Sequence, residues 1–321
     1  MAPAVSDRTQ PGDYGGFVAL VWLPEDDWPQ HLRLPAELTV EVWRSGMPVP
    51  SSIRQVEFYV PEYLGPASVI EITHEMPSLR VIQTLTAGYD DYLAALGQLR
   101  PGVKLCNAAG VHDASTSELA VGLALASLRG FVGFVRAQDE GAWLHARHDS
   151  LADRRVMLVG VGSVGSAIAR RLEPFEVDLT LVGRSARPGV RASAELASLL
   201  PAAEVVILAV PYSDATHHLV DREFLAAMPD GALLVNVSRG AVVDTDALLP
   251  ELEAGRLRAA LDVTDPEPLP AEHPLWRAPN VLISPHVGGD TTAFLPRAWA
   301  LLQSQLDTFA AGDRLANVVA G

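Results

Sequence analysis

Short, almost continuously apolar runs alternate along the chain with longer stretches in which apolar residues recur at helical spacing. Such runs are typical of parallel strands that are covered on both faces. They predict strands at residues 17–22, 38–43, 56–60, 79–85, 155–160, 177–182, 205–210, 232–237 and 280–285. Helical patterns separate the later runs at residues 164–175, 221–229 and 245–257. Because strands and helices alternate, the pattern predicts an α/β protein with doubly wound parallel sheets.

Two further apolar stretches predict helices outside this alternation. Residues 117–137 connect the two series of strands, and the polar cluster at their start offers Ser115, Thr116 or Ser117 as the N-cap. We expect this helix to open a second domain. Residues 296–313 predict a final helix, which could return to the first domain.

The length of 321 residues suggests two domains, and a hydrophobic content of 49% provides enough apolar residues for two cores. We place the boundaries on either side of the second series of strands. The first domain then spans residues 1–107 and is completed by 288–321, and the second spans 108–287.

Charge and cysteine content narrow the choice of partners. The chain has 24 Lys and Arg against 39 Asp and Glu, which argues against binding to a nucleic-acid backbone. The first 16 residues lack the apolar core of a signal peptide. The apolar stretch at 119–128 has half the length of the roughly 20 residues that a membrane span needs. Since the single cysteine, Cys106, fits a reducing compartment, we expect a cytoplasmic protein without nucleic-acid or membrane partners.

A glycine-rich motif follows the first strand of the second series. In "LVGVGSVGSAIARRL", Gly160, Gly162 and Gly165 have the spacing G-x-G-x-x-G between a strand and a helix. This context predicts a dinucleotide site: the first glycine permits a tight turn, the second lets the backbone approach a pyrophosphate, and the third lets helix and strand pack closely. The helix N-terminus would then attract the anion. The simpler interpretation is a glycine-rich turn without a ligand.

The next strand lacks the acidic residue that an NAD site places at its end. Gly183 occupies that position, and Asp178 lies five residues upstream, ~16 Å away towards the wrong end of the strand. Arg184, Ser185 and Arg187 follow instead, and arginine's planar fork suits a phosphate. The turn therefore predicts a preference for NADP over NAD, although a solvated basic loop remains the alternative.

Three later stretches place charged residues at strand ends. "NVSRGAVVD" contains Arg239, "LDVTDPEPLP" contains Asp262 and Glu267, and "SPHVGGD" contains His286. Open α/β sheets bind their ligands at the carboxyl ends of strands. A guanidinium, a carboxylate and an imidazole at such an edge form a candidate catalytic group of Arg239, Glu267 and His286.

Each of these residues also has a simpler interpretation. Arg239 could be a surface cation, Glu267 a solvated loop carboxylate, and one histidine among nine is more often structural than catalytic. Their combination with the glycine-rich loop is what favours catalysis. His145 and His148 have a spacing that metal ligands can have, but without a third ligand they predict no metal site.

In this combination the chain resembles the D-isomer-specific 2-hydroxyacid dehydrogenase family over roughly residues 80–290. "GRSARP" and "LDVTDPEPLPAEHPL" look most like its glyoxylate/hydroxypyruvate reductase branch, which uses NADPH. The resemblance implies a flavodoxin-like substrate domain and a Rossmann cofactor domain around a cleft. It also implies reduction of a small 2-oxo acid, with NAD(H) possible as the second cofactor.

The resemblance assigns a role to each candidate residue. Arg239 would hold the carbonyl and carboxylate oxygens of the 2-oxo acid, His286 would donate the proton, and Glu267 would orient His286. Asp262 would contact the nicotinamide carboxamide. The other residues that the family uses to line the cofactor match Ser163, Val164, Val237, Ser238, Arg239, His286 and Gly288.

In the first domain, "TLTAGYDD" resembles the family's substrate loop. The backbone N–H groups of Ala87 and Gly88 would bind the substrate carboxylate, unless the stretch is a simple turn with Gly88 at positive φ. "YVPEY", residues 59–63, is less typical of the reductase branch and leaves the exact substrate open. Trp143 lies in the region that forms the family's dimer interface, so we expect a homodimer.

Three alternative functions stay open at this point. The chain could be a dehydrogenase for another D-2-hydroxy acid. It could oxidise formate or phosphite, although the formate branch typically has glutamine where this chain has Glu267. A non-catalytic dinucleotide sensor, like the corepressors built on this fold, is the third alternative, because fold does not fix function.

Overall fold

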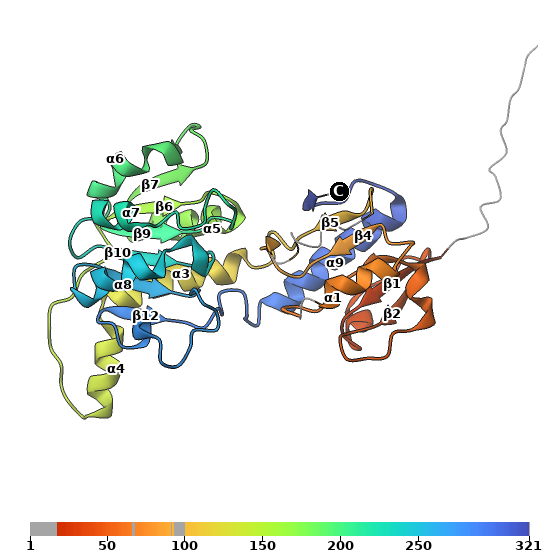
Figure 1. Cartoon of the computed structure of the whole chain (residues 1–321), viewed down its shortest axis with the longest axis horizontal. Coiled ribbons are helices and arrows are strands. Elements are labelled where there is room, and N and C mark those ends of the chain that lie inside the picture. Colours follow the sequence, from red (N-terminus) through yellow and green to blue (C-terminus); the bar gives the residue numbers. More distant parts are fainter. Residues whose placement is uncertain (1–17, 66–67, 91, 93–99, 321) are drawn as a thin grey trace, which may run out of the picture. The chain divides into compact units, whose positions relative to one another are not determined.

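The computed structural model describes residues 18–65, 68–90, 92 and 100–320. The chain divides into two compact units, each of which is treated by itself (Figure 1). Unit 1 contains the described parts of Met1–Leu85, Ala95–Cys106 and Trp299–Gly321, and unit 2 those of Thr86–Ala94 and Asn107–Ala298. Both units combine helices with a sheet of mainly parallel strands, which confirms the predicted fold class.

Unit 1 is built on a six-stranded sheet in the order β13-β5-β4-β3-β1-β2. Its strands are β1 (Ala19–Leu23), β2 (Leu38–Val42), β3 (Val56–Tyr59), β4 (Val81–Gln83), β5 (Lys104–Cys106) and β13 (Val318–Ala320). The first five are parallel, and β13 pairs with β5 in the antiparallel direction. β1 to β4 confirm the four predicted runs. The pattern does not predict β5 or β13, because three residues are too few to show a run.

The core of unit 1 is aromatic and is closed by the C-terminal helix. Trp22 is fully buried and stacks on Trp43 with 5.2 Å between ring centroids. The helix α9 (Phe294–Ala311) begins two residues before the prediction, and Gln305 in its second half donates hydrogen bonds to Gln83 Oε1 (2.7 Å) and to the Ala316 carbonyl (3.0 Å). The short helices among the described residues of this unit are η1 (Trp28–His31), η2 (Ser51–Gln55), α1 (Ser68–Glu71) and η3 (Ile72–Glu75).

Unit 2 contains a seven-stranded, fully parallel sheet in the order β12-β11-β10-β9-β6-β7-β8. Its strands are β6 (Arg155–Val159), β7 (Asp178–Gly183), β8 (Arg191–Ala192), β9 (Val205–Leu208), β10 (Leu233–Asn236), β11 (Arg258–Leu261) and β12 (Val281–Ile283). The five later runs of the sequence correspond to β6, β7, β9, β10 and β12. The order reverses beside β6, which is the position where doubly wound sheets bind ligands.

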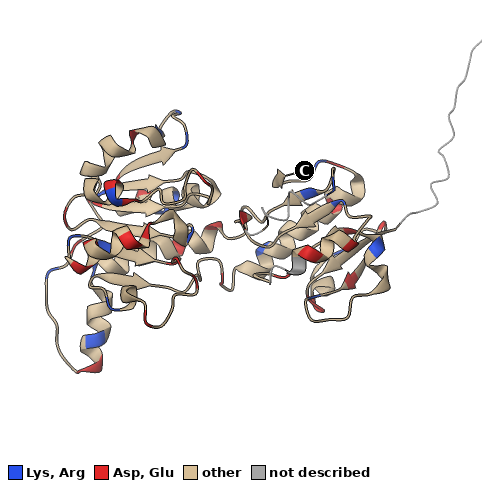
Figure 2. Cartoon of the chain, in the orientation of Figure 1, with Lys and Arg blue, Asp and Glu red and all other residues tan. Residues whose placement is uncertain are grey.

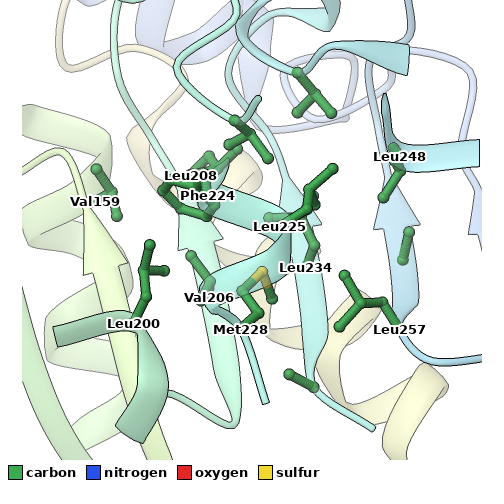
Figure 3. Close-up of a cluster of buried hydrophobic side chains, with 14 of the residues drawn as sticks. Val159, Leu200, Val206, Leu208, Phe224, Leu225, Met228, Leu234, Leu248 and Leu257 are labelled. Carbon is green, nitrogen blue, oxygen red and sulfur yellow. The ribbon is translucent and has the colours of Figure 1, made fainter. Parts of the chain in front are cut away.

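Helices cover both faces of this sheet. They are α3 (Asp113–Leu128), α4 (Phe131–Asp139), α5 (Ser163–Leu172), α6 (Leu196–Leu199), α7 (Arg222–Ala227) and α8 (Thr245–Glu253), with η4 (Glu173–Phe175), η5 (Ser193–Glu195), η6 (Leu200–Ala202), η7 (Gly240–Val242) and η8 (Pro274–Trp276) between them. In β9, Val206 and Leu208 belong to one buried cluster, which includes Phe224 of α7 (Figure 3). Val205 and Ile207 belong to the second cluster, with residues of α3 and α5. Alternate side chains of one strand therefore serve two cores, which explains its continuously apolar sequence.

The prediction for the start of α3 is wrong. The helix begins at Asp113, and the N-cap is His112. Ser115 and Ser117 lie inside the first turns: Ser117 Oγ donates to the Ala114 carbonyl (2.9 Å), and Ser115 Oγ lies 2.7 Å from Thr291 Oγ1. These hydroxyls therefore serve partners other than the free amides of the helix terminus.

The predicted helix at 117–137 is also two helices rather than one. Gly130 has φ +69° between α3 and α4, and a Cβ at this position would lie 2.4 Å from the His148 ring. The axes of the two helices differ by 65°. No single helix within the described residues has the length and hydropathy of a membrane span, and only α3 and α4 counted together across their bend reach them.

Candidate active site

The glycine-rich loop joins β6 to α5, and its three glycines have different surroundings. Gly160 has φ +101°, and a Cβ there would lie 2.2 Å from the Ala209 carbonyl oxygen. A Cβ on Gly165 would lie 1.9 Å from the Gly160 oxygen, so the close approach of helix and strand requires glycine. A Cβ on Gly162 would meet no atom within 4 Å. The open space at Gly162 faces the start of α5, where Ser163 and Val164 begin the helix with backbone amides that the helix cannot pair.

The turn after β7 is basic, and it leans towards the glycine-rich loop. Gly183 ends the strand and Asp178 begins it, so this acid is at the far end from the turn. The backbones of Arg187 and Val190 exchange hydrogen bonds of 3.0 and 2.8 Å, and Arg187 Nη2 donates to the Val161 carbonyl at 3.4 Å. Arg184 and Ser185 are exposed. Figure 2 shows basic residues on this turn between β7 and α6.

The structure shows a packing reason for Gly183; that it leaves room for a phosphate stays a prediction. A Cβ at this position would lie 3.1 Å from side-chain carbons of Val161 and Val190, and 3.3 Å from Arg187 Nη1. These contacts are tighter than ordinary van der Waals distances. The residue thus lets the turn after β7 close against the glycine-rich loop.

The three candidate catalytic residues come from the carboxyl ends of three neighbouring strands. Arg239 follows β10, Glu267 lies in the loop after β11, and His286 follows β12. His286 Nδ1 forms a hydrogen bond with a carboxylate oxygen of Glu267. Val237 and Ser238, next to Arg239, are buried.

Charges shift the pKa values of this pair in opposite directions. The hydrogen bond with Glu267 raises the pKa of His286 above its ordinary value; desolvation and the Arg239 guanidinium act against this shift. Burial raises the pKa of Glu267, but the hydrogen bond and charge of His286, helped by Arg239, lower it overall. The pair therefore favours an imidazolium beside a carboxylate at neutral pH.

Asp262 holds the loop that carries His286. Its side chain is buried, its Oδ1 accepts hydrogen bonds from Ser284 Oγ (2.7 Å) and the Val287 N–H (3.0 Å), and its Oδ2 accepts one from the Gly288 N–H (2.9 Å). The His286 N–H donates to the Asp262 carbonyl at 2.7 Å. His286 has φ +53°, an uncommon conformation for a non-glycine residue. Four hydrogen bonds to one residue therefore hold the histidine in a strained backbone position.

Arg239 is held from two directions. Its Nε donates to Asp90 Oδ2 at 3.1 Å, and its Nη1 donates to the Ser238 carbonyl at 2.8 Å. Buried Asn236 fixes the turn itself, because its Nδ2 donates to the Arg239 carbonyl (2.9 Å) and its Oδ1 accepts from the Ser238 N–H (3.0 Å) and Oγ (2.6 Å).

The predicted substrate loop lies against this guanidinium. A Cβ on Gly88 would lie only 1.6 Å from Arg239 Nη2. Gly88 does not have a positive φ, so the alternative of a simple left-handed turn is wrong, and crowding by Arg239 explains the glycine. Asn107 Nδ2 holds the loop through the Ala87 carbonyl at 2.7 Å, and Thr86 Oγ1 donates to the Gly88 carbonyl at 2.7 Å.

The family follows from a comparison with known sequences. Residues 121–288 match the family described as the D-isomer specific 2-hydroxyacid dehydrogenase, NAD binding domain, and this range contains the glycine-rich loop, Arg239, Glu267 and His286. The chain belongs to the D-isomer specific 2-hydroxyacid dehydrogenase family. It is thus an oxidoreductase that uses a nicotinamide dinucleotide and acts on small 2-oxo or 2-hydroxy acids.

Individual relatives agree with this family. The human glyoxylate reductase/hydroxypyruvate reductase is 34% identical over 81% of this chain and 84% of the relative. The glyoxylate reductase of Pyrococcus horikoshii is 30% identical over 87% and 89%. The crystal structure of a D-isomer specific 2-hydroxyacid dehydrogenase from Xanthobacter autotrophicus Py2, in complex with NADPH and MES, has a TM-score of 0.80 at 28% identity and covers 94% of this chain and 98% of that one.

The residues of this dehydrogenase fit a dinucleotide. Gly162 leaves open space beside the amides at the start of α5, where a pyrophosphate can accept their hydrogen bonds. When bound, the nicotinamide supplies the hydride.

Sequence reasoning missed the residues that hold the candidate catalytic side chains. Asp90 is one of two acids in "TLTAGYDD", and this was its only signal. Asn236 begins "NVSRGAVVD", and Ser284 stands two residues before His286.

Proposed function

We propose that this dehydrogenase reduces small 2-oxo acids to D-2-hydroxy acids with NADPH, with glyoxylate or hydroxypyruvate as the first choice of substrate. The observation that carries the proposal is the hydrogen-bonded pair of His286 and Glu267 at the sheet edge where Arg239 also lies. Unit 2, which contains the glycine-rich loop, would bind the cofactor. The names of the human and Pyrococcus relatives support the choice of substrate.

In the proposed reaction, Arg239 binds the carboxylate and polarises the carbonyl of the 2-oxo acid. The guanidinium has the flat fork that suits two oxygens. Backbone N–H groups of Ala87 and Gly88 bind the carboxylate from the other side.

His286 donates the proton to the carbonyl oxygen as the alcohol forms. Its Nδ1 is bound to Glu267, so Nε2 is the nitrogen that transfers the proton. Because Glu267 raises the pKa of His286, the protonated form persists at neutral pH and can act as the acid. In the opposite direction the same nitrogen accepts the proton.

A panel assay tests the activity. Glyoxylate, hydroxypyruvate and larger 2-oxo acids are each offered with NADPH and with NADH, and the chirality of the product is determined. We expect steady turnover with the smallest acids and a D-hydroxy product where a stereocentre forms. If no 2-oxo acid is turned over while NADPH binds, the proposal fails and the dinucleotide sensor takes its place.

The preference for NADPH rests on the turn after β7. Gly183 stands in place of an acid that would repel a 2′-phosphate, and Arg184, Ser185 and Arg187 follow it. Arg187 also contacts the backbone of the glycine-rich loop. The NADPH complex of the Xanthobacter relative supports this choice.

Paired variants test the cofactor preference. We expect R184A with R187A to lower kcat/KM for NADPH and to leave that for NADH nearly unchanged. R191A is the matched control, because Arg191 lies close by in the sequence but forms an ion pair with Glu195. Adding Gly183→Asp to R184A should move the preference further towards NADH. A ratio of NADPH to NADH activity that none of these changes moves would contradict the assignment.

We also propose a homodimer formed through α4 and the segment after it. Several large apolar side chains are exposed there: Phe131, Phe134, Val135, Trp143 and Leu144. Trp143 is 94% exposed, and a cluster of this kind is typical of a protein–protein interface. Sedimentation of the protein and of Val135→Asp should show a dimer and a monomer; two identical profiles would contradict this interface. A cytoplasmic location stays a prediction from the single, buried Cys106.

A further inference from the structure

The ion pair between Asp90 and Arg239 joins residues that are 149 positions apart in the sequence. Oδ2 of Asp90 accepts a hydrogen bond from Nε of Arg239 at 3.1 Å. Both side chains are mostly shielded, with exposed fractions of 18% for Asp90 and 28% for Arg239. An ion pair in this setting has lost much of the solvent that weakens pairs on an open surface.

The contacts of Arg239 divide its guanidinium into fixed and available edges. A guanidinium has five N–H groups. Asp90 takes the Nε–H, and the Ser238 carbonyl takes one from Nη1 at 2.8 Å. Nη2 lies over Gly88, and no acceptor for it occurs among the described residues. The groups left for a ligand are therefore those of Nη2 and one of Nη1.

We propose that Asp90 is a positioning residue for Arg239. Its carboxylate fixes Nε, so that the opposite edge of the guanidinium faces the oxygens of the 2-oxo acid. This inference rests on the proposed role of Arg239 as the substrate-binding cation. Gly88 provides the second half of the arrangement, because only a residue without a Cβ leaves room for Nη2.

Orientation matters here because an arginine side chain has several rotatable bonds. With Asp90 absent, the Ser238 carbonyl would be the only hydrogen-bond acceptor of the guanidinium among the described residues. A misplacement of about 1 Å can reduce the rate of a positioned reaction by ~100-fold.

Four variants separate positioning from a general structural effect. D90A removes the acceptor, whereas D90N keeps an amide oxygen that can accept from Nε. G88A leaves Asp90 in place but inserts a methyl group where Nη2 lies. D178A is the control, because Asp178 is an exposed acid of the same unit at the start of β7.

Kinetics give the first readout. We expect D90A and G88A to lower kcat/KM for glyoxylate by about 100-fold, through both kcat and KM, with the Kd for NADPH unchanged. D90N should recover most of this loss, and D178A should behave as wild type. Wild-type kinetics in D90A would overturn the inference. So would an equal loss of NADPH affinity in D90A, or a D90N no better than D90A.

A second readout needs no substrate. Phenylglyoxal modifies accessible arginines, and peptide mass spectrometry measures the rate of modification at Arg239. We expect faster labelling in D90A than in wild type and D90N, because the guanidinium is no longer held in place by the carboxylate and its terminal nitrogens become more accessible. If the wild-type enzyme reduces no 2-oxo acid, the proposed function fails, but the labelling still tests the ion pair. An unchanged labelling rate in D90A overturns the inference and leaves the proposed function standing.

Discussion

The substitution Gly162→Ala separates the folding of the glycine-rich loop from its binding of the cofactor. A Cβ at 162 would meet no protein atom within 4 Å, and the residue has φ −75°, which alanine adopts freely. Gly165 differs, because its Cβ would lie 1.9 Å from a backbone oxygen that cannot move aside. The same chemical change should therefore affect binding at one position and folding at the other.

Two small effects on the stability of G162A oppose each other. Replacing glycine restricts the unfolded chain and stabilises by about 0.4–1 kcal/mol. Gly162 is also the N-cap of α5, where alanine is less favourable than glycine by roughly 0.5–1 kcal/mol. The two terms nearly cancel, so we expect the Tm without cofactor to stay near that of the wild type. Overpacking in G165A should cost about 1–3 kcal/mol or more.

The effect of G162A on NADPH binding should be much larger. The methyl group would fill the space through which we expect a pyrophosphate to reach the amides of α5. Loss of one hydrogen bond to a charged group costs about 1.5–3 kcal/mol. At 1.4 kcal/mol for each factor of ten, this raises the Kd for NADPH by roughly 10- to 100-fold.

Calorimetric titration with NADPH and thermal unfolding without it measure the two quantities. Gly122→Ala is the matched control, since a Cβ on this exposed residue of α3 also meets no atom within 4 Å. This control variant should raise the Tm slightly and leave the Kd for NADPH unchanged. Wild-type affinity in G162A would refute the placement of the pyrophosphate at this loop.

Three further predictions concern the loops after β11 and β12. H286A should reduce kcat by about 10²–10⁴-fold while NADPH still binds, and near-normal turnover would rule out the proton-donor role. E267Q should lower the pKa of His286, because the wild-type carboxylate raises it. Since reduction needs protonated His286, the alkaline limb of its pH profile should move to lower pH, and an unmoved limb would count against the pair. D262N places an N–H₂ group opposite the backbone N–H donors of Val287 or Gly288. The free energy of unfolding should therefore fall by about 1–3 kcal/mol. An unchanged Tm would contradict the role of Asp262 in holding this loop.

Much of unit 2 could be predicted from sequence because its strands are buried on both faces. β9 and β10 are apolar at every position but the last of β10, where Asn236 turns out to fix the Arg239 loop. The glycine-rich loop was also predictable, since Gly160 and Gly165 are each required by a close backbone contact within the loop and its neighbouring strand. The edge strands β8 and β13 were not, because two or three residues carry too little pattern.

What the sequence could not give is a partner that lies far along the chain. The hydroxyl of Ser115 suggested a helix cap, but Thr291, 176 residues away, lies within hydrogen-bond distance of it. The N-cap residue of α3 is His112, a residue that the sequence analysis did not consider for this position. The local sequence determines which hydrogen bonds a serine or threonine side chain can form, and the tertiary contacts determine which of them it does form.

The same limit applies to the reactive groups themselves. Glu267 binds the imidazole of His286, Asp262 holds its backbone, and Asp90 holds the guanidinium of Arg239. The hydrogen bond from the His286 N–H to Asp262 spans 24 positions (286 − 262), the Glu267 contact spans 19, and the Asp90 contact spans 149. Neither His286, with its φ of +53°, nor the long side chain of Arg239 would keep its orientation through its neighbours in the sequence alone. Each reactive group therefore becomes oriented only when the segment carrying its acid has folded, which couples the geometry of the site to the folding of unit 2.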